Sequence, residues 1–194
     1  MTSIDPTRID IKFDPQIQRM SGVAYHGNTP FDVPFISQIE GNLWQGGCER
    51  GLILPEFIEH VVSLYPWEEY YHNLSPENHI QIKMYDSESQ AFDQVDEIAA
   101  KVNEFVEQGP TLVHCQAGLN RSSLVAARSL MLKGRTADEA ISLIRESRSP
   151  ACLCNPSFEG WLRSIDGKAA LNRLREYEDE IGLGADLDEE ELNF

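Results

Sequence analysis

The 194-residue sequence predicts an α/β fold in which helices flank a central, mostly parallel and twisted sheet of about five strands. Short apolar or alternating runs bounded by turn residues indicate the strands, and segments with apolar residues at helical spacing stand between and after them. The run TLVHC at residues 111–115 leads through a turn into SLVAARSLML at 123–132, which is a strand–turn–helix pattern. A chain of this length can bury a full core, so we expect one compact domain.

Composition divides the chain into three parts. Residues 1–30 contain three prolines and no sustained hydrophobic period, which predicts an extended N-terminal arm. Residues 31–175 hold the predicted strands and helices and would form the folded domain. Residues 176–194 carry nine acidic residues and no basic one. We interpret this last part as a solvated acidic tail in preference to an interaction tail.

Four strands are predicted before the first long helix. FISQI and LWQGG, at residues 35–39 and 43–47, flank a Glu-Gly-Asn turn at 40–42. HVVSLY at 60–65 and HIQIKMY at 79–85 are the next two, and the second alternates between polar and apolar residues. With TLVHC they make the five strands of the expected sheet.

Helical spacing dominates the chain after residue 85. Apolar residues recur three or four positions apart from Gln90 to Gln108, and Ser87 with Gln90 forms a possible capping box. Three more helices are predicted after TLVHC, each with a recognisable cap or break. They are residues 123–132 with Gly134 as C-cap, 137–147 capped by Thr136, and about 157–180 with a break at Gly167.

The charge and cysteine content argue against several classes of function. The formal charge is −16, and nucleic acids or anionic membranes, which need a basic footprint, are therefore not expected as partners. No stretch approaches the ~18 uninterrupted apolar residues of a membrane span, which predicts a soluble, cytoplasmic protein. Four scattered cysteines without histidines at zinc-finger spacing predict neither a disulfide scaffold nor a metal site.

The segment VHCQAGLNRSS, residues 113–123, has the pattern of an anion-binding loop. A strand that enters a glycine-containing turn and opens a helix directs backbone N–H groups and the positive end of the helix dipole toward one point. Arg121 would close such a loop, because a guanidinium offers two parallel donors to a phosphate. The cradle itself would consist of Gln116, Ala117, Gly118, Leu119 and Asn120.

Cys115 would lie beneath the bound anion as a nucleophile. A helix N-terminus and a nearby arginine depress thiol pKa values to roughly 3.5–7.5, so the thiolate would be favoured. Such a thiolate is in line for attack on phosphorus. For an isolated pair of Cys115 and Arg121, an ordinary buried cysteine and a surface arginine would be the better interpretation.

The whole run H-C-Q-A-G-L-N-R-S resembles the signature loop of the protein tyrosine phosphatase superfamily, H-C-x-x-G-x-x-R-[ST], in its dual-specificity branch. The resemblance extends to ISQIEGNLWQGG, HVVSLY and NPSFEGWL and covers about residues 35–165. It implies a dual-specificity phosphatase-like fold and a cofactor-free hydrolase of phosphorylated proteins. By the same resemblance Cys115 is the nucleophile, Arg121 the phosphate clamp, Ser122 the hydroxyl that stabilises the leaving thiolate, and His114 a support for the loop.

A phosphatase of this kind also needs a general acid, because the leaving oxygen must be protonated. Asp86 follows the strand at 79–85 and precedes a helix, as the acid of this family does, and Glu88 is the alternative. The same carboxylate would activate the water that hydrolyses the phosphocysteine. No segment resembles the phosphotyrosine-recognition loop of the larger tyrosine-specific enzymes, so we expect a shallow pocket that admits phosphotyrosine, phosphoserine and phosphothreonine.

Other functions stay open at this point. A phosphatase-like module could bind phosphopeptides without turnover, although the intact Cys115 and Arg121 favour an enzyme. Asn120-Arg121 also matches the H-C-T-H-G-x-N-R loops of RNA 5′-triphosphatases, but Gln116-Ala117 and the acidic charge do not. Phosphoinositide phosphatases often carry loop lysines, which are missing here, and rhodanese-like sulfurtransferases hold fewer residues between cysteine and arginine.

Two smaller groups of residues have weaker interpretations. Trp67, Tyr70 and Tyr71 could line the rim of a substrate pocket, but aromatic side chains more often serve packing. Cys152 and Cys154 could relieve oxidation of the catalytic thiol by forming a disulfide, although the sequence does not favour this interpretation.

Overall fold

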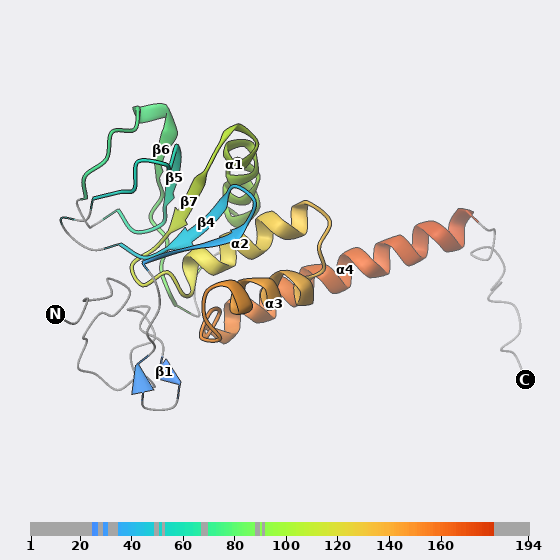
Figure 1. The fold of residues 1–194 in the computed structure, drawn as a ribbon. Coiled ribbons are helices and arrows are strands. Elements are labelled where there is room, and N and C mark those ends of the chain that lie inside the picture. Colours follow the sequence, from blue (N-terminus) through green and yellow to red (C-terminus); the bar gives the residue numbers. More distant parts are fainter. Residues whose placement is uncertain are drawn as a thin grey trace, which may run out of the picture.

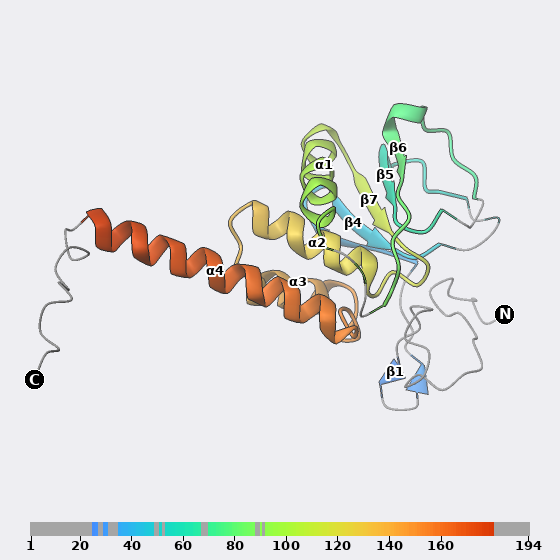
Figure 2. The ribbon, with the colours of Figure 1, turned by 180° about the vertical axis from the view of Figure 1, so that it is seen from behind.

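The structure, a computed structural model, describes residues 25–26, 29–30, 35–48, 51, 53–66, 70–87, 90 and 92–180. Figures 1 and 2 show its elements from opposite sides. In chain order they are β1 (Tyr25–His26), β2 (Thr29–Pro30), β3 (Ile36–Glu40), β4 (Leu43–Gly46), β5 (His60–Ser63), the 3-10 helix η2 (Pro76–Asn78), β6 (His79–Gln81), α1 (Val95–Gln108), β7 (Thr111–His114), α2 (Arg121–Leu132), α3 (Ala137–Ser147) and α4 (Pro156–Glu180). β1 and β2 pair with each other, and the other strands form the main sheet.

The main sheet has five strands in the spatial order β3-β4-β7-β5-β6. β3 runs antiparallel to β4, and all other neighbours are parallel, which confirms the predicted fold. In the central strand β7, His114 is in register with Gly46 of β4 and Ser63 of β5. The carboxyl ends of these strands therefore meet at one edge, and the segment after His114 leaves from the middle of that edge.

Alternate residues of the buried strands face two different hydrophobic clusters. On one face, Val62 and Val113 belong to the larger cluster, which includes residues of all four α-helices. On the other face, Val61 and Leu112 pack with Leu54, which follows β4. Figures 1 and 2 show the helices gathered on one side of the sheet. On the opposite side, Leu54, Ile58 and Leu74 pack against the sheet.

α2 is the helix on which the other three pack. Its first seven residues, from Arg121 to Ala127, are all buried, as expected for a helix inside a core. α1 buries Val95, Ile98 and Val102, whose spacing gives the helix one apolar face. The start of α2 is thus fixed by core packing on several sides, which matters because the predicted anion loop ends there.

Two predicted helix boundaries are confirmed. At the start of α3, the Thr136 hydroxyl accepts the Glu139 backbone N–H at 3.3 Å, and the Glu139 carboxylate accepts the Thr136 backbone N–H at 2.8 Å. After α2, Gly134 has a φ of +99° and donates its N–H to the Met131 carbonyl at 2.9 Å. Both boundaries depend on residues a few positions apart, which is why the sequence predicts them.

Three predicted boundaries are wrong. α1 begins at Val95 and not at Gln90, because the Gln90 amide oxygen accepts the Tyr85 backbone N–H at 2.8 Å and keeps residue 90 in the preceding loop. β6 ends at Gln81, well before residue 85. α4 continues through Gly167, since an isolated glycine costs an exposed helix only about 1 kcal/mol relative to alanine.

Some sequence predictions fall outside the described residues. They concern most of the arm at 1–30, residues 181–194 of the acidic tail, Trp67 and Glu88. The division into an arm, a domain at 31–175 and a tail therefore stays a prediction. Among the described helices, none combines the length and the apolar composition needed to cross a membrane.

The capping box of α3 leads to a prediction on stability. Thr136→Ala removes the hydroxyl that accepts the Glu139 N–H, so the free energy of unfolding should fall by about 1 kcal/mol. Thr136→Ser keeps the acceptor and should stay close to the wild type. Denaturant unfolding of the three proteins checks this, and equal stability of the alanine and serine variants would contradict it.

Candidate active site

The segment after β7 forms a short, closed loop that opens α2. Residues 115–120 connect His114, the last residue of β7, to Arg121, the first of α2. Every residue from 114 to 122 is buried except Gln116, which is half-buried. The structure therefore places the predicted cradle residues, Cys115 and Arg121 on one short, curved segment of the chain.

The carbonyl oxygens of this loop are held by donors around its outside. The Cys115 carbonyl accepts from His114 Nδ1 at 3.3 Å, and the Gln116 carbonyl accepts from the Cys48 backbone N–H at 2.9 Å. Arg148 donates to the next two carbonyls, through Nη2 to Ala117 at 3.3 Å and through Nε to Gly118 at 2.5 Å. The Gly118 carbonyl also accepts from Gln45 Nε2 at 2.9 Å, and the Leu119 carbonyl accepts from the Leu153 backbone N–H at 2.8 Å. In a trans peptide the C=O and N–H groups point in opposite directions. The N–H groups of residues 116–120 therefore face the interior of the loop, where they can bind an anion.

Arg148 and Gln45 hold the candidate loop in place, and the sequence prediction missed both. Arg148 follows α3 directly and is only 7 % exposed, and its guanidinium also donates to the Ser37 hydroxyl at 3.2 Å. Gln45 lies on β4, and its amide also donates to the Ser123 hydroxyl at 2.7 Å. Neither belongs to a local motif. The related signal in the sequence is that Arg148 directly follows the predicted helix at 137–147. A basic residue at such a position is usually exposed to solvent, so this signal did not predict a contact with the loop.

Gly118 is required by the closure of this loop. Its φ is +70°, in the left-handed region that favours glycine. A Cβ atom at this position would overlap the backbone carbonyl of Gly46 and the guanidinium of Arg148. The glycine thus lets the loop lie directly against the end of β4.

Cys115 has the environment of a stabilised thiolate. Burial alone would raise the pKa of this thiol, but the Arg121 charge, the Ser122 hydroxyl and the Ser122 backbone N–H together lower it below the usual thiol range, against a smaller opposing effect of Asp86. The Ser122 oxygen lies 3.5 Å from the Cys115 sulfur. Ser122 is thus placed to donate a hydrogen bond to the sulfur whenever the sulfur carries the charge.

Arg121 offers a free pair of donors beside the loop. One of its terminal nitrogens, Nη1, donates to the Met84 carbonyl at 3.3 Å, and the guanidinium lies 5.1 Å from the centre of the Tyr65 ring. Its Nε and Nη2 atoms are buried and have no hydrogen-bond partner within the described part of the chain. These two atoms form one edge of the planar fork, which matches two oxygens of a phosphate.

Asp86 lies next to this loop and is buried, with 2 % of its surface exposed. Its carboxylate accepts hydrogen bonds from Asn120 Nδ2 at 2.9 Å and from Asn155 Nδ2 at 3.1 Å. Burial raises the pKa of Asp86, and the two amides and the Arg121 charge reduce this rise without cancelling it. This carboxyl therefore holds its proton to a higher pH than an ordinary aspartate.

Asn155 is a further residue that the sequence prediction missed. Besides its bond to Asp86, its backbone N–H donates to Asn120 Oδ1 at 3.0 Å. Its own side-chain oxygen accepts the Ser157 backbone N–H at 3.1 Å in the first turn of α4. Asn155 thus connects the start of α4 to both the carboxyl of Asp86 and the loop. The segment NPSF contains it, but nothing in that segment indicates contact with residue 86.

The remaining candidate residues of the sequence analysis lie in different environments. Tyr71 is 69 % exposed and lies away from the loop. All four cysteines are free. Cys152 is buried and burial raises its pKa, whereas the exposed Cys154 donates its thiol proton to Asn120 Oδ1 at 3.3 Å. The proposed relief of oxidation by these two cysteines stays a prediction.

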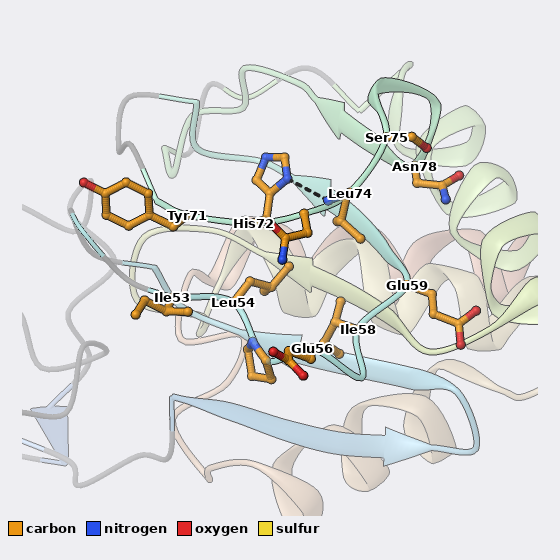
Figure 3. A pocket seen from close by; sticks show the side chains of 12 residues that line it. Ile53, Leu54, Glu56, Ile58, Glu59, Tyr71, His72, Leu74, Ser75 and Asn78 are labelled. Carbon is orange, nitrogen blue, oxygen red and sulfur yellow. Dashed lines mark hydrogen bonds between the residues drawn. The ribbon is translucent and has the colours of Figure 1, made fainter.

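A separate pocket of about 690 Å³ lies between the segments 53–59 and 71–78. Figure 3 shows its apolar side chains, Ile53, Leu54, Ile58 and Leu74, together with His72 and two glutamates. No residue of the loop at 115–120 lines it. Across the described ranges, no three His, Cys, Asp or Glu residues cluster as ligands of a metal ion would.

Comparisons with solved structures show that other proteins share this fold. Solved structures with the same fold include a mouse putative dual specificity phosphatase complexed with zinc tungstate, with 16 % identity, a TM-score of 0.59 and coverage of 77 % of this chain and 97 % of that chain. Human DUSP28 has 16 % identity, a TM-score of 0.59 and coverage of 71 % and 96 %. PTPMT1 in complex with PI(5)P has 14 % identity, a TM-score of 0.55 and coverage of 72 % and 99 %.

At the level of sequence, no curated protein matches this chain significantly. The model of the family described as dual specificity phosphatase, catalytic domain, matches residues 56–167, more than half of the chain. This range contains the loop, Asp86 and Asn155. The chain therefore belongs to the dual-specificity branch of the protein tyrosine phosphatase superfamily.

Proposed function

We propose that this protein is a phosphatase that hydrolyses phosphotyrosine, phosphoserine and phosphothreonine in proteins through a phosphocysteine intermediate. The observation that carries the proposal is the pairing of Cys115, a thiol with a lowered pKa, with the free Nε–Nη2 edge of Arg121. A nucleophile and a bidentate anion clamp meet at one loop whose N–H groups face inward. Nucleophilic displacement at phosphorus is the chemistry that such a site supports.

In the first step, the phosphate oxygens bind the loop N–H groups and the Arg121 fork, and the Cys115 sulfur attacks phosphorus. The S–P bond forms while the bond between phosphorus and the leaving oxygen breaks. Asp86, whose pKa is raised by burial, acts as the acid and gives its proton to that oxygen. The products of this step are the dephosphorylated hydroxyl group, a phosphocysteine and the Asp86 carboxylate.

In the second step, a water molecule attacks the phosphocysteine and the Asp86 carboxylate accepts its proton. The S–P bond breaks, inorganic phosphate leaves, and the sulfur departs as a thiolate. The Ser122 hydroxyl, 3.5 Å from this sulfur, donates a hydrogen bond to the departing charge. The acid is then protonated and the nucleophile ionised, as at the start.

The composition of the loop supports a protein substrate. Between Cys115 and Arg121 it contains no charged residue, so it offers no cation to the additional phosphates of a phosphoinositide. The formal charge of −16 also opposes the approach of an RNA 5′-triphosphate. A single phosphate on a neutral or basic peptide is the ligand that remains.

Turnover measurements across substrate classes test the proposal. Phosphotyrosyl and phosphoseryl peptides, a phosphoinositide and an RNA 5′-triphosphate are offered to the wild type and to Cys115→Ser. We expect phosphate release from both peptides by the wild type alone. Release from only the phosphoinositide or the RNA would contradict the protein substrate, and binding of the peptides without release by the wild type would indicate a binding module.

The free edge of Arg121 leads to a prediction on its replacement. Arg121→Ala should lower kcat/KM by about 10³-fold, and Arg121→Lys by nearly as much, because the lysine restores the charge without the two parallel donors. Arg128→Lys, on the same helix with its guanidinium bound to Asp96, is the matched control and should keep most of the activity. Near-native kcat/KM in the Arg121→Lys protein would remove the role of clamp.

Asp86 leads to a prediction that depends on the leaving group. An alkoxide is strongly basic and needs the proton in the transition state, whereas a nitrophenolate departs almost unaided. Asp86→Asn should lower turnover of a phosphoseryl or phosphotyrosyl peptide by about 10²–10⁴-fold and that of nitrophenyl phosphate by much less. Asp93→Asn, an exposed aspartate before α1, is the control. If Glu88 is the acid instead, Glu88→Gln and not Asp86→Asn would lower turnover of the peptide far more than turnover of nitrophenyl phosphate.

The same assignment predicts the pH profile of kcat/KM. Catalysis needs the Cys115 thiolate and the protonated Asp86 together. Because the pKa of Cys115 is lowered, the acidic limb of the profile should lie below the usual thiol range. Because the pKa of Asp86 is raised, the basic limb should lie above the usual carboxyl range. Asp86→Asn should flatten the basic limb. An unchanged basic limb in that variant would show that another group is titrating.

A further inference from the structure

The pocket of Figure 3, which we call the sheet groove, begins at the same edge of the sheet as the phosphate-binding loop. Tyr71, at one end of this groove, directly follows Tyr70 in the chain. The Tyr70 hydroxyl lies 2.8 Å from His114 Nε2, at the end of β7, and 2.9 Å from His79 Nε2 on β6. Ile53 pairs with Tyr71 in a parallel β-bridge, and Figure 3 shows both at this end of the groove.

The other end of the sheet groove lies at the opposite edge of the sheet. Glu59 precedes His60, the first residue of β5, which is in register with Thr111, the first residue of β7. Asn78, beside Glu59 in Figure 3, precedes the first residue of β6. β7 has four residues, which rise by roughly 13 Å, so an extended peptide segment of about the same length would fill the groove.

The floor of the sheet groove is part of the folded core. Leu54 and Ile58 are buried, and Leu74 packs against them from the other wall, in the smaller hydrophobic cluster. The Leu54 backbone N–H donates to the Tyr71 carbonyl at 2.9 Å, which joins the two walls. The groove is therefore preformed, and a ligand does not have to order its walls on binding.

Large apolar side chains are exposed along this groove. Within the described residues, the exposed large apolar side chains are Ile53, Phe57, Tyr71, Tyr85 and Leu132, and the first three belong to the two segments that form the groove. Ile53 is 76 % exposed and Tyr71 is 69 % exposed. A single exposed apolar residue is ordinary, but a rigidly held group beside a groove is typical of a surface that another molecule covers.

The charges of the sheet groove indicate the chemistry of that molecule. Glu56 and Glu59 line the groove, and no lysine or arginine does. Neither glutamate takes part in an ion pair within the described part of the chain. His72 Nδ1 accepts the Leu74 backbone N–H at 3.2 Å, which requires an unprotonated nitrogen. A segment with apolar and basic side chains is the complement of this groove.

We propose that the sheet groove binds a segment of the phosphoprotein substrate that contains apolar residues together with lysine or arginine. The inference rests on the proposed function, because the phosphorylated residue in the loop and the bound segment belong to one substrate chain, which passes over the edge of the sheet. Apolar side chains of the segment contact Leu54, Ile58 and Leu74, and its basic side chains pair with Glu56 and Glu59. Such a second contact lowers KM without acting on the chemical step.

The first test measures binding without turnover. Three pools of short, fluorescently labelled, unphosphorylated peptides are offered to the full chain: apolar residues with Lys and Arg, apolar residues with Asp and Glu, and Ser and Thr with Lys and Arg. Fluorescence anisotropy should show the tightest binding for the first pool. Binding of the first pool that is no tighter than that of either other pool would overturn the inference.

Charge variants locate this binding. Glu56→Lys combined with Glu59→Lys should weaken binding of the first pool about tenfold. Glu97→Lys combined with Glu107→Lys changes the net charge equally, at exposed positions of α1 on the other side of the sheet, and should weaken binding much less. Equal losses in the two proteins would show that only the overall negative charge attracts the peptides, and would overturn the inference.

An apolar variant tests the other half of the complement. Ile53→Asn should weaken binding of the first pool about five- to tenfold, whereas Leu132→Asn, at an exposed leucine that ends α2, should leave it unchanged. Sedimentation of the wild type and of Ile53→Asn tests whether a second copy of the chain occupies the groove. A wild-type dimer that Ile53→Asn dissociates would overturn the peptide as the occupant.

Turnover then separates this inference from the proposed function. A phosphotyrosyl peptide joined through linkers of increasing length to the tightest-binding sequence should have, at one or more lengths, a KM about tenfold below that of the unextended peptide. This gain should vanish in the protein with Glu56→Lys and Glu59→Lys, which should hydrolyse the unextended peptide like the wild type. Hydrolysis of both peptides with equal KM would overturn the inference and keep the function. Binding in the groove without phosphate release from any peptide would refute the function and, with it, the substrate as the partner.

Discussion

The outward direction of five carbonyl groups is the constraint on which this active site depends. A loop of six residues can turn its N–H groups inward only if every carbonyl from Cys115 to Leu119 finds a donor outside, because an unpaired buried carbonyl is costly. Those donors come from the end of β7, from β4 and the segment that follows it, from Arg148 after α3 and from the loop before α4. The sheet, α3 and α4 therefore act together to hold one short stretch of backbone, and Gly118 is the residue that lets them approach it.

The same arrangement sets the protonation of the two reacting groups in opposite directions. The charge of Arg121 lowers the pKa of both Cys115 and Asp86. For Cys115 it combines with two hydrogen bonds from Ser122 and outweighs burial. For Asp86 burial remains the larger effect, and the two neutral amides together with the Arg121 charge only reduce it. The two shifts move these pKa values toward each other, which favours the pair of an ionised nucleophile and a protonated acid that a two-step phosphoryl transfer requires.

The sequence predicts the features whose causes are local. The strand, glycine turn and helix around Cys115, the capping box at Thr136 and the hairpin between β3 and β4 each depend on residues a few positions apart. Arg148, Gln45 and Asn155 could not be predicted as site residues, because their roles arise from contacts across long sequence separations. The start of α1 was misplaced because a bond between Tyr85 and Gln90, five positions apart, holds residue 90 in the preceding loop. Tyr70 was interpreted as packing because its hydrogen bonds join it to residues of two distant strands.

The account as a whole requires that phosphorus is transferred to the sulfur of Cys115. Rapid acid quenching of the full chain during turnover of a phosphotyrosyl peptide, followed by mass spectrometry of its proteolytic fragments, tests this directly. In the wild type we expect one phosphoryl group on the fragment that contains Cys115. The Asp86→Asn protein should carry more of it if hydrolysis of the intermediate is slowed more than its formation. The Cys115→Ser protein should carry none. Turnover without a phosphorylated Cys115 fragment, or with phosphate on another residue, would contradict the account.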